Sequence, residues 1–300
     1  MAGHRGLVGS AIVRNIEASN EHEWFGRTRS ELDLLDRKAV FEFVAAETPD
    51  AVIIAAAKVG GIMANNTYPV EFLSENLQIE TNLIDACHKA GIERVLFLGS
   101  SCIYPKLSPQ PIKEEYLLTG PLEPTNEAYA LAKISGLKLV ESYRREYNRR
   151  WISAMPTNMY GPGDNFDPQN SHVLPALIRR FHEAKLSGAQ SVTCWGDGSP
   201  MREFLHADDL ASACIFMLEK YDGDVALNVG TGEDITIREL TEIIADVVGY
   251  QGEILWDIER PNGTPRKLLD VSKLKGLGWE PRLALREGIA STYKWYLAQA

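Results

Sequence analysis

Gly3-His4-Arg5-Gly6-Leu7-Val8-Gly9 stands almost at the start of the chain and leads directly into a helical pattern over residues 7–16. In such a G-x-x-G-x-x-G loop the glycines let the backbone approach a pyrophosphate closely, and the helix N-terminus offers free N–H groups to the anion. A glycine-rich turn alone is weak evidence for a nucleotide site, and its confirming context is a preceding strand. The loop predicts a dinucleotide-binding α/β fold if the rest of the sequence agrees.

The strand that should lead into this loop has no room in the sequence, because only Met1 and Ala2 precede Gly3. In a doubly wound fold that first strand is central, and its loss removes a row of hydrogen bonds from the middle of the sheet. We therefore expect that the sequence starts about one strand too late. An in-frame stop codon directly before Met1, together with a stably folded product, contradicts that expectation.

A second strand is predicted at residues 23–25, and the segment after it carries Arg27 and Arg29. In NAD sites an acidic residue at this place holds the ribose 2′-hydroxyl, whereas a nearby arginine suits the 2′-phosphate of NADP. Arg29 and Arg5 therefore favour NADP over NAD, although two solvated surface arginines would give the same pattern.

Three apolar runs follow, at residues 51–57, 94–99 and 151–155, as expected of strands buried on both faces. Helical patterns separate them at residues 71–90 and 126–147, with apolar residues near a 3.6-residue period. The alternation predicts an α/β protein with a Rossmann-type doubly wound parallel sheet, its first strand missing, and helices on both faces.

The pattern of predicted elements changes after about residue 160, where loop signals alternate with short strands and helices. We expect a Rossmann domain that binds NADP at residues 1–160. Residues 161–300 are expected to form mainly a smaller α/β substrate-binding domain, with some segments returning to the first domain. The strands predicted there are residues 192–195, 226–229 and 253–256.

The composition excludes several classes of protein. The net charge of −10 comes from 41 acidic and 31 basic residues with no block of Lys or Arg, which argues against nucleic-acid and anionic-membrane partners. No apolar run approaches the ~20 residues of a membrane span, and the first residues lack a signal-peptide pattern, so a cytoplasmic protein is expected. The four cysteines form no C-x-x-C pair, so no metal site is expected, and Cys87, Cys194 and Cys214 are predicted to be buried thiols.

Tyr129 and Lys133 form a Y-x-x-x-K pair, and on a helix this spacing places both side chains on one face. An ammonium beside a phenol lowers the pKa of the phenol, so the tyrosine can exchange a proton near neutral pH while hydride moves. A surface helix pair has the same spacing. The strand at residues 94–99 adds context, because Ser100 follows it and the carboxyl ends of parallel strands face the ligand crevice.

These features together resemble the extended short-chain dehydrogenase/reductases. Within that superfamily the sequence resembles the GDP-L-fucose synthases, which are GDP-4-keto-6-deoxy-D-mannose 3,5-epimerase/4-reductases, from Gly3 to near the C-terminus. The segments that carry the closer resemblance are residues 55–62, 99–105, 123–126, 156–158, 170–172, 195–198 and 201–206. Several of these motifs are specific to this family rather than to the superfamily.

The resemblance implies a substrate with a ketone at C4, whose protons at C3 and C5 are therefore acidic. It assigns the base and the acid of the epimerisation to Cys102 and His172, and the contacts to the C4 oxygen to Ser100 and Tyr129. Tyr129 then supplies the proton for reduction by NADPH, and Lys133 also binds the nicotinamide ribose. A thiol can act as a base if nearby positive charge lowers its pKa, and histidine suits the acid role. Without the resemblance, Cys102 reads as a packed thiol and His172 as a capping or surface histidine.

The implied NADP site extends beyond the glycine-rich loop and Arg29. Its other residues are Leu98, Gly99, Ser100, Ser101, Lys133, Pro156, Thr157, Asn158, Met159 and His172. The implied substrate pocket comprises Arg180, Trp195, Arg202, Asn262 and Lys267. Trp195 could equally be a core residue at a strand end. Family members often carry Asp where Asn262 stands, which bears on nucleotide preference, because an amide accepts a hydrogen bond without charge assistance.

Two alternatives stay open on the sequence. One is a UDP- or dTDP-sugar 4-epimerase or dehydratase of the same fold, which keeps NAD bound and needs no pair like Cys102 and His172. The other is a non-catalytic NADP-binding sensor or scaffold, since such proteins can lose the catalytic tyrosine or lysine. The resemblance also implies a homodimer through the helices at residues 71–90 and 126–147.

Overall fold

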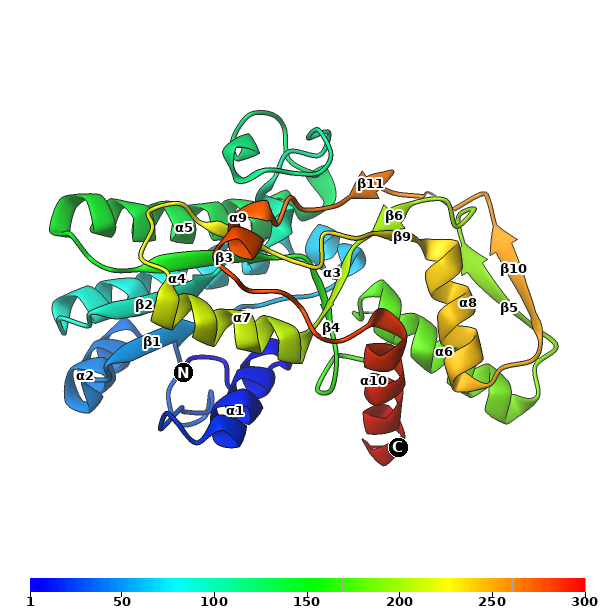
Figure 1. Ribbon diagram of the computed structural model, residues 1–300, viewed down its shortest axis with the longest axis horizontal. Helices are drawn as coiled ribbons and strands as arrows, with labels where there is room; N and C mark the ends of the chain where they lie inside the picture. Colours follow the sequence, from blue (N-terminus) through cyan, green and yellow to red (C-terminus); the bar gives the residue numbers. More distant parts are fainter. Residues whose placement is uncertain (169, 261, 300) are drawn as a thin grey trace.

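The computed structural model describes residues 1–168, 170–260 and 262–299. Figure 1 shows a layered part built around a parallel sheet and, beside it, a part built mainly from α6, α8, α10 and the strand pair β5 and β10. Among the described residues no helix combines the length and the apolar character needed to cross a membrane.

The main sheet has the strand order β1-β2-β3-β8, and all its neighbouring strands run parallel. Its strands are β1 (Ala51–Ile54), β2 (Arg94–Leu98), β3 (Ile152–Pro156) and β8 (Leu227–Val229). All but the first residues of β1 and β2 are buried, as expected for apolar runs covered on both faces. The predicted Rossmann-type parallel sheet is thus confirmed, and β8 shows one late segment joining it.

Helices cover both faces of this sheet (Figure 1). On one face α2 (Arg37–Glu47), α4 (Pro69–Lys89) and α5 (Glu127–Tyr147) form one apolar cluster with the strands. On the other face α1 (Leu7–Ser19) and α7 (Ala207–Lys220) form a second cluster. This layering leaves the carboxyl ends of the strands open to a ligand at one edge of the sheet.

The predicted strand at residues 23–25 is wrong, because the structure has no strand there. Met1 and Ala2 occupy the place between this segment and β1: Ala2 N donates to Ile53 O over 3.0 Å, and the Met1 ammonium donates to Phe25 O over 2.9 Å. A strand needs a partner along its length, and two residues supply only the first bonds of a ladder. The expectation given above for the missing first strand of the sheet stays a prediction.

The remaining elements lie mainly in the second half of the chain, where a third apolar cluster joins α6, α8, α10 and β5. Three short sheets accompany it: β5 with β10, β4 with β7, and β11-β6-β9. The helices are α3 (Ile62–Thr67), α6 (Val173–Ser187), α8 (Ile237–Val248), α9 (Ser272–Gly276), α10 (Leu285–Gln299) and the 3-10 turns η1 (Ser101–Ile103), η2 (Glu114–Tyr116) and η3 (Pro124–Asn126). The strands are β4 (Asn158–Tyr160), β5 (Ser191–Trp195), β6 (Met201–Arg202), β7 (Phe204–His206), β9 (Ile235–Thr236), β10 (Glu253–Asp257) and β11 (Arg266–Lys267).

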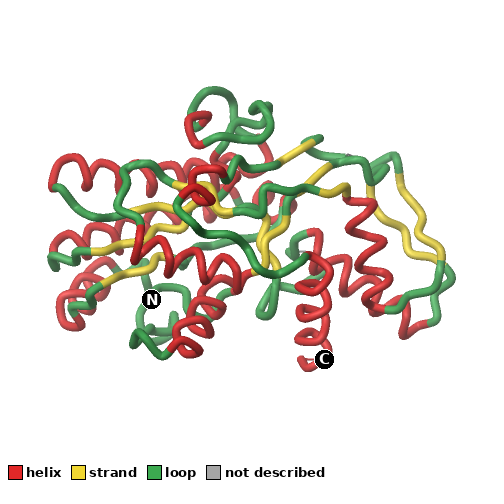
Figure 2. Tube along the Cα trace, viewed as in Figure 1, coloured by secondary structure: helices red, strands yellow, loops and turns green. Residues whose placement is uncertain are grey.

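A loop excursion between η1 and α5 rises above the sheet (Figure 2) and includes the short helical turns η2 and η3. An isolated parallel bridge joins its Ile112 to Leu269, just after β11. The excursion therefore ties a segment from near the end of the chain to the carboxyl end of β2.

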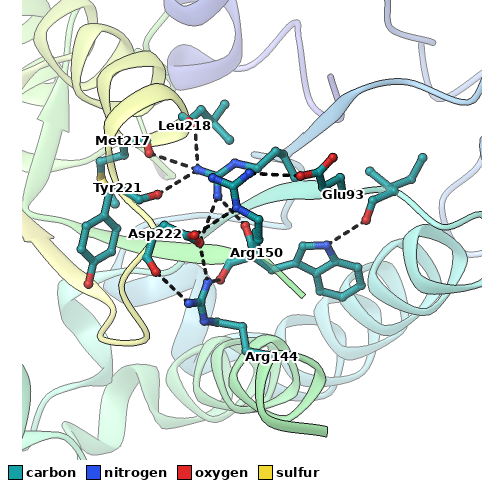
Figure 3. A network of polar contacts seen from close by, with 10 residues as sticks. Glu93, Arg144, Arg150, Met217, Leu218, Tyr221 and Asp222 are labelled. Atoms are coloured by element: carbon teal, nitrogen blue, oxygen red, sulfur yellow. Dashed lines mark hydrogen bonds and ion pairs between the residues drawn. The ribbon is translucent and has the colours of Figure 1, made fainter. Parts of the chain in front are cut away.

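Three arginines fix the opposite edge of the sheet around Asp222 (Figure 3). Arg94, the first residue of β2, donates to Leu218 O and Tyr221 O at the end of α7 over 2.7 and 2.9 Å. Arg144 and Arg150 reach Asp222 over 2.9 and 3.0 Å. These contacts join α7, α5 and β2 far from the carboxyl ends of the strands.

Candidate active site

The glycine-rich loop packs against the chain that follows β1. Gly3 has φ +86°, and a Cβ on it would lie 2.7 Å from Ala56 N; a Cβ on Gly9 would lie 1.9 Å from Gly3 O. Only glycine fits at these two places. The N-cap of α1 is Gly6, which offers no side-chain oxygen, and the first turn carries no acidic residue. The first amides of α1 therefore remain available to an anion, which is the cradle that a pyrophosphate requires.

The surroundings of this loop favour a phosphate on the ribose. Arg5 and Arg29 are exposed, and the carboxylate of Glu31 is engaged locally, because it accepts hydrogen bonds from Thr28 N and Oγ1, both over 2.7 Å. Those bonds, with smaller effects of Arg27 and Arg5, lower the pKa of Glu31. The Nδ1 atom of His4 is buried and has no hydrogen-bond partner among the described residues. Arg5 and Arg29 thus remain accessible to a phosphate at this end, as NADP needs.

The other predicted cofactor residues follow the carboxyl ends of neighbouring strands. Leu98, Gly99, Ser100 and Ser101 end or follow β2, and residues 156–159 end β3 and lead into β4. Backbone bonds hold both turns in place, since Gly99 N donates to Ala154 O over 2.9 Å and Thr157 N donates to Val229 O over 3.0 Å. The sheet therefore brings these segments to one edge.

Tyr129 points into this edge from the first turn of α5. Protein atoms enclose its phenol and raise its pKa; the nearby charges of Cys102 and Glu80 act in the same direction, whereas a hydrogen bond with Ser100 opposes the rise. The sequence-based expectation that Lys133 lowers this pKa is therefore not met in this structure. The reason is geometric, because Nζ of Lys133 lies 6.0 Å from the centre of the Tyr129 ring.

Lys133 is turned toward the sheet and toward α4. Its Nζ donates to Leu98 O over 2.9 Å and lies 3.1 Å from Oε1 of Glu80. Glu80 was not among the predicted site residues. A signal for it exists in the sequence, because it falls on the buried stripe of α4 with Asn76 and Leu83, where a carboxylate is unexpected.

Lys267 lies close to both Cys102 and His172. The Lys267 ammonium lies 3.5 Å from Sγ of Cys102, so the thiol has the neighbouring positive charge that a thiolate base needs. His172 is the N-cap residue of α6, and its side chain makes no capping hydrogen bond. Solvent reaches His172, yet the crowding around its ring lowers its pKa, and the charge of Lys267 lowers it further.

A buried carboxylate fixes the segment that carries Lys267. Strand β11 pairs with β6, and immediately after it Leu269 N donates to Glu203 Oε2 over 3.0 Å and Leu268 N donates to Gln110 Oε1 over 2.8 Å. Glu203 is fully buried and also accepts a bond from Gly232 N over 2.7 Å. The role of Glu203 could not be read from the sequence, because its partners come from three separate segments.

The predicted substrate residues lie in the second half of the chain. Arg202 and Lys267 are register partners in β6 and β11, so their backbones are adjacent. Arg180 donates to Thr193 O, in the middle of β5, over 2.9 Å. Trp195 is 57% exposed with Arg260 over its ring, so the core alternative for this tryptophan is wrong.

The contacts of Asn262 with Asp197 explain why an amide rather than a carboxylate stands at this position. Its Oδ1 accepts a hydrogen bond from Asp197 N over 3.0 Å, and the amide also contacts the Asp197 carboxylate, whose pKa is lowered by hydrogen bonds from Ser199 and then from Asn262. A carboxylate at position 262 would repel that of Asp197. The residue thus fixes the turn after β5, next to Trp195.

Comparisons with known proteins agree with this site. The model of the NAD dependent epimerase/dehydratase family matches residues 1–230. The chain is 58% identical over 297 residues to the putative GDP-L-fucose synthase 2 of Arabidopsis thaliana, covering 99% of this chain and 90% of that protein. It is 57% identical over 307 residues to the GDP-L-fucose synthase of Escherichia coli (strain K12), covering 99% and 95%.

A solved structure gives the same result for the fold. The GDP-L-fucose synthetase from Naegleria fowleri, bound to NADP, aligns with a TM-score of 0.92 at 25% identity, covering 99% of this chain and 93% of that one. The glycine cradle, the Tyr129 and Lys133 pair and the neighbouring Cys102 and His172 are the features expected of such an enzyme. The chain therefore belongs to the NAD-dependent epimerase/dehydratase family and, within it, to the GDP-L-fucose synthases.

Proposed function

We propose that this chain converts GDP-4-keto-6-deoxy-D-mannose to GDP-L-fucose, by epimerisation at C3 and C5 followed by NADPH-dependent reduction at C4. The observation that carries this proposal is one cluster of five side chains beside the dinucleotide cradle. Its members are Ser100, Cys102, Tyr129, His172 and Lys267.

Cys102 and His172 serve the epimerisation. Removing a proton next to the C4 ketone leaves an enolate whose charge sits on the C4 oxygen. Cys102, with the Lys267 ammonium 3.5 Å from its sulfur, takes that proton, and His172 returns one on the opposite face. Ser100 and Tyr129, which interact with each other, donate hydrogen bonds to the C4 oxygen and hold the developing charge.

Tyr129 serves the reduction. NADPH, when bound, supplies the hydride that is delivered to C4. Tyr129 donates its proton to the C4 oxygen, and its raised pKa suits it to act as an acid rather than as a resting phenolate. The amides at the start of α1 and the exposed Arg5 and Arg29 hold the phosphates of the cofactor, and Lys133 holds its ribose.

The substrate's GDP part is assigned to the second half of the chain. Arg180, Arg202 and Lys267 supply positive charge for its two phosphates in a protein with net charge −10. Trp195, exposed beside the turn that Asn262 fixes, offers an apolar face for the base or the sugar. A division into residues 1–160 for the cofactor and 161–300 for the substrate is part of this proposal.

The two alternative functions are less well supported. A UDP- or dTDP-sugar epimerase or dehydratase with bound NAD has no use for a lysine on the Cys102 sulfur or for the exposed Arg29. A non-catalytic sensor has no need of Ser100 and Tyr129 in contact with each other at the cofactor edge.

One purified sample tests the function in two steps. NADPH is titrated by fluorescence, and GDP-4-keto-6-deoxy-D-mannose is then added while NADPH absorbance and the product are followed. We expect NADPH binding and formation of GDP-L-fucose, and Tyr129→Phe should bind NADPH without turnover. NADPH binding by the wild type without turnover contradicts the substrate assignment, and absence of NADPH binding contradicts the cofactor assignment.

A homodimer and a cytoplasmic location complete the proposal. Helices α4 and α5 have 21 residues each and lie side by side at the surface (Figure 1), so together they offer one long face to a second copy. Light scattering after size exclusion should give a mass about twice 33.4 kDa. A mass equal to that of one chain at micromolar concentration contradicts the dimer.

A further inference from the structure

The Lys133 ammonium lies in a buried polar pocket between β2, α4 and α5. Its Nζ is 2.9 Å from Leu98 O and 3.1 Å from Oε1 of Glu80, and the lysine and glutamate side chains are 3% and 1% exposed. The Phe97 ring covers the ammonium at 4.8 Å. A carboxylate on α4 therefore faces the charge of the lysine that the proposed function places at the cofactor.

Helix α5 makes room for this carboxylate at Gly136, three residues after Lys133. A Cβ at Gly136 would lie 2.6 Å from Oε2 of Glu80 and 2.5 Å from the Phe97 ring. Glycine inside a helix is less favourable than alanine. Helix α5 thus carries a residue of low helix propensity at the position where Glu80 approaches Lys133.

Stability does not account for this pair. Neither carboxylate oxygen of Glu80 accepts a directed hydrogen bond among the described residues, and both are enclosed. Burial raises the pKa of Glu80, and the ammonium of Lys133 opposes that rise. Replacing a buried ion pair with apolar side chains of similar volume is often neutral or stabilising. A group that is unfavourable for folding yet accommodated by its neighbours indicates a role in the reaction.

The contacts of Lys133 show what that role is. The ammonium donates a hydrogen bond to Leu98 O and forms an ion pair with Glu80. These two contacts hold a long, flexible side chain in one orientation, and an ammonium has further donors for a ligand oxygen. Tyr129 lies one helical turn earlier, with its ring centre 6.0 Å from Nζ.

We propose that Glu80 is a positioning residue whose carboxylate holds the Lys133 ammonium charged and aligned, so that Lys133 can bind the cofactor ribose and support proton donation by Tyr129. The kinetic part of this inference rests on the proposed function, whereas the part on cofactor binding does not need the sugar substrate. The charged or titratable groups that bear on this pocket are Lys133 and Tyr129 on α5 and Cys102 after β2.

The test compares Glu80→Gln with Glu141→Gln, which removes a surface ion pair with Lys138 from α5. In Glu80→Gln we expect weaker NADPH binding and a reduction rate lower by on the order of 10- to 100-fold, as for a misplaced catalytic group. Exchange of solvent deuterium at C3 and C5 should fall much less, and the pH profile of reduction should move. Glu141→Gln should match the wild type in all three measurements.

Thermal unfolding without NADPH separates this role from a structural one. Because burial raises the pKa of Glu80, the folded state binds its proton more tightly, and stability is lost as pH rises above the unfolded pKa of about 4.5. In Glu80→Gln the removal of this cost and the loss of the partner of the buried Lys133 ammonium act on stability in opposite directions, so the melting temperature is measured together with NADPH affinity and reduction rate. A lower melting temperature in Glu80→Gln, with NADPH affinity and reduction rate unchanged, overturns the proposal.

The two proposals fail in different ways. If the wild type does not reduce the GDP-sugar, the proposed function fails, and the NADPH affinity of Glu80→Gln still decides the role of Glu80. If Glu80→Gln does not fold, Glu80→Asp is tested instead. Its side chain is one methylene shorter, so the carboxylate keeps its charge but lies farther from Lys133. We expect it to weaken NADPH binding. Wild-type affinity and rate in Glu80→Asp then contradict the positioning role.

Discussion

Cys102 and Tyr129 lie close enough for the charge of one to act on the other, yet the proposed chemistry gives them separate steps. Cys102 has the Lys267 ammonium at its sulfur, and Tyr129 has the hydroxyl of Ser100 at its phenol. Single substitutions can therefore separate proton exchange from reduction, because neither removes the partner of the other residue.

Cys102→Ala should abolish solvent-deuterium exchange at C3 and C5, since no thiolate remains to take the proton, and should leave NADPH affinity unchanged. Tyr129→Phe should slow reduction by on the order of 10²–10⁴-fold, the usual contribution of a general acid, and reduce exchange less. Mass spectrometry of the recovered sugar nucleotide measures the exchange. Normal exchange in Cys102→Ala would show that another residue is the base.

Asp164 gives the protein a pH-dependent stability near the cofactor loop. Burial raises the pKa of Asp164 to about 7, opposed by a bond from Asn165 N, and Oδ2 has no hydrogen-bond partner among the described residues. The folded state therefore holds this proton more tightly than the unfolded chain. The stabilisation is complete below the unfolded pKa of ~4 and is lost as pH rises through about 7, up to about 4 kcal/mol as an upper limit.

Asp164→Asn should remove this dependence, because an amide stays neutral over the same range. Its free energy of unfolding in urea should exceed that of the wild type at pH 8, and the difference should shrink toward pH 4. Asp33→Asn, at an exposed turn, is the control and should follow the wild type. Parallel curves for Asp164→Asn and the wild type from pH 4 to 8 would exclude a titrating Asp164.

At the scale of elements, the regular helices and the buried strands could be predicted from the sequence, whereas the short pairings could not. Helix α4 was expected at residues 71–90 and spans Pro69–Lys89, because its apolar period extends over many turns. Strands such as β6 and β11 have two residues each and exist only because distant segments meet. The strand predicted at residues 23–25 is absent for a related reason, since this segment has no neighbouring strand to pair with along its length.

The polar network in Figure 3 belongs to this scale, because it joins α7, α5 and β2. Asp222→Ala should lower the free energy of unfolding by about 1–2 kcal/mol, a small effect because the Asp222 side chain is 48% exposed and its ion pairs are partly screened. Turnover should stay at the wild-type rate, since the network lies at the opposite edge of the sheet from the site. Urea unfolding measures the change.

Glu93→Gln is the matched control, because Glu93 pairs with Arg150 but is 69% exposed. It should change the unfolding midpoint less than Asp222→Ala does. Equal midpoints for all three proteins would mean that the network contributes nothing to stability, and lost turnover in Asp222→Ala would mean that the two edges of the sheet are coupled.

At the scale of the whole molecule, the site needs both ends of the chain. Ser100, Tyr129 and Lys133 are named as candidates by local patterns and Cys102 by the resemblance, and their roles stay predictions. The role of Glu203 could not be predicted, and Glu80 shows only as a carboxylate on a buried helix stripe, because their partners lie far away in the sequence. Lys267 reaches Cys102 only because the loop excursion and Glu203 hold the chain after β11.

Gln110→Ala should loosen this connection by removing the acceptor of Leu268 N. One hydrogen bond contributes about 1 kcal/mol, so exchange at C3 and C5 should slow by about fivefold while NADPH affinity is unchanged. Gln190→Ala, which loses only a contact within its own turn, should show neither effect. Equal exchange rates in both variants would mean that the excursion does not position Lys267.

Cys102 is also the one cysteine of the chain that is not buried, since Cys87, Cys194 and Cys214 are enclosed in the apolar clusters. An electrophilic reagent should consequently alkylate this protein at a single position. Ligands bound at the proposed substrate site would shield that sulfur, so the rate of labelling measures the occupancy of the site. Inhibitor screening could then proceed by intact-mass measurement, without the unstable keto-sugar.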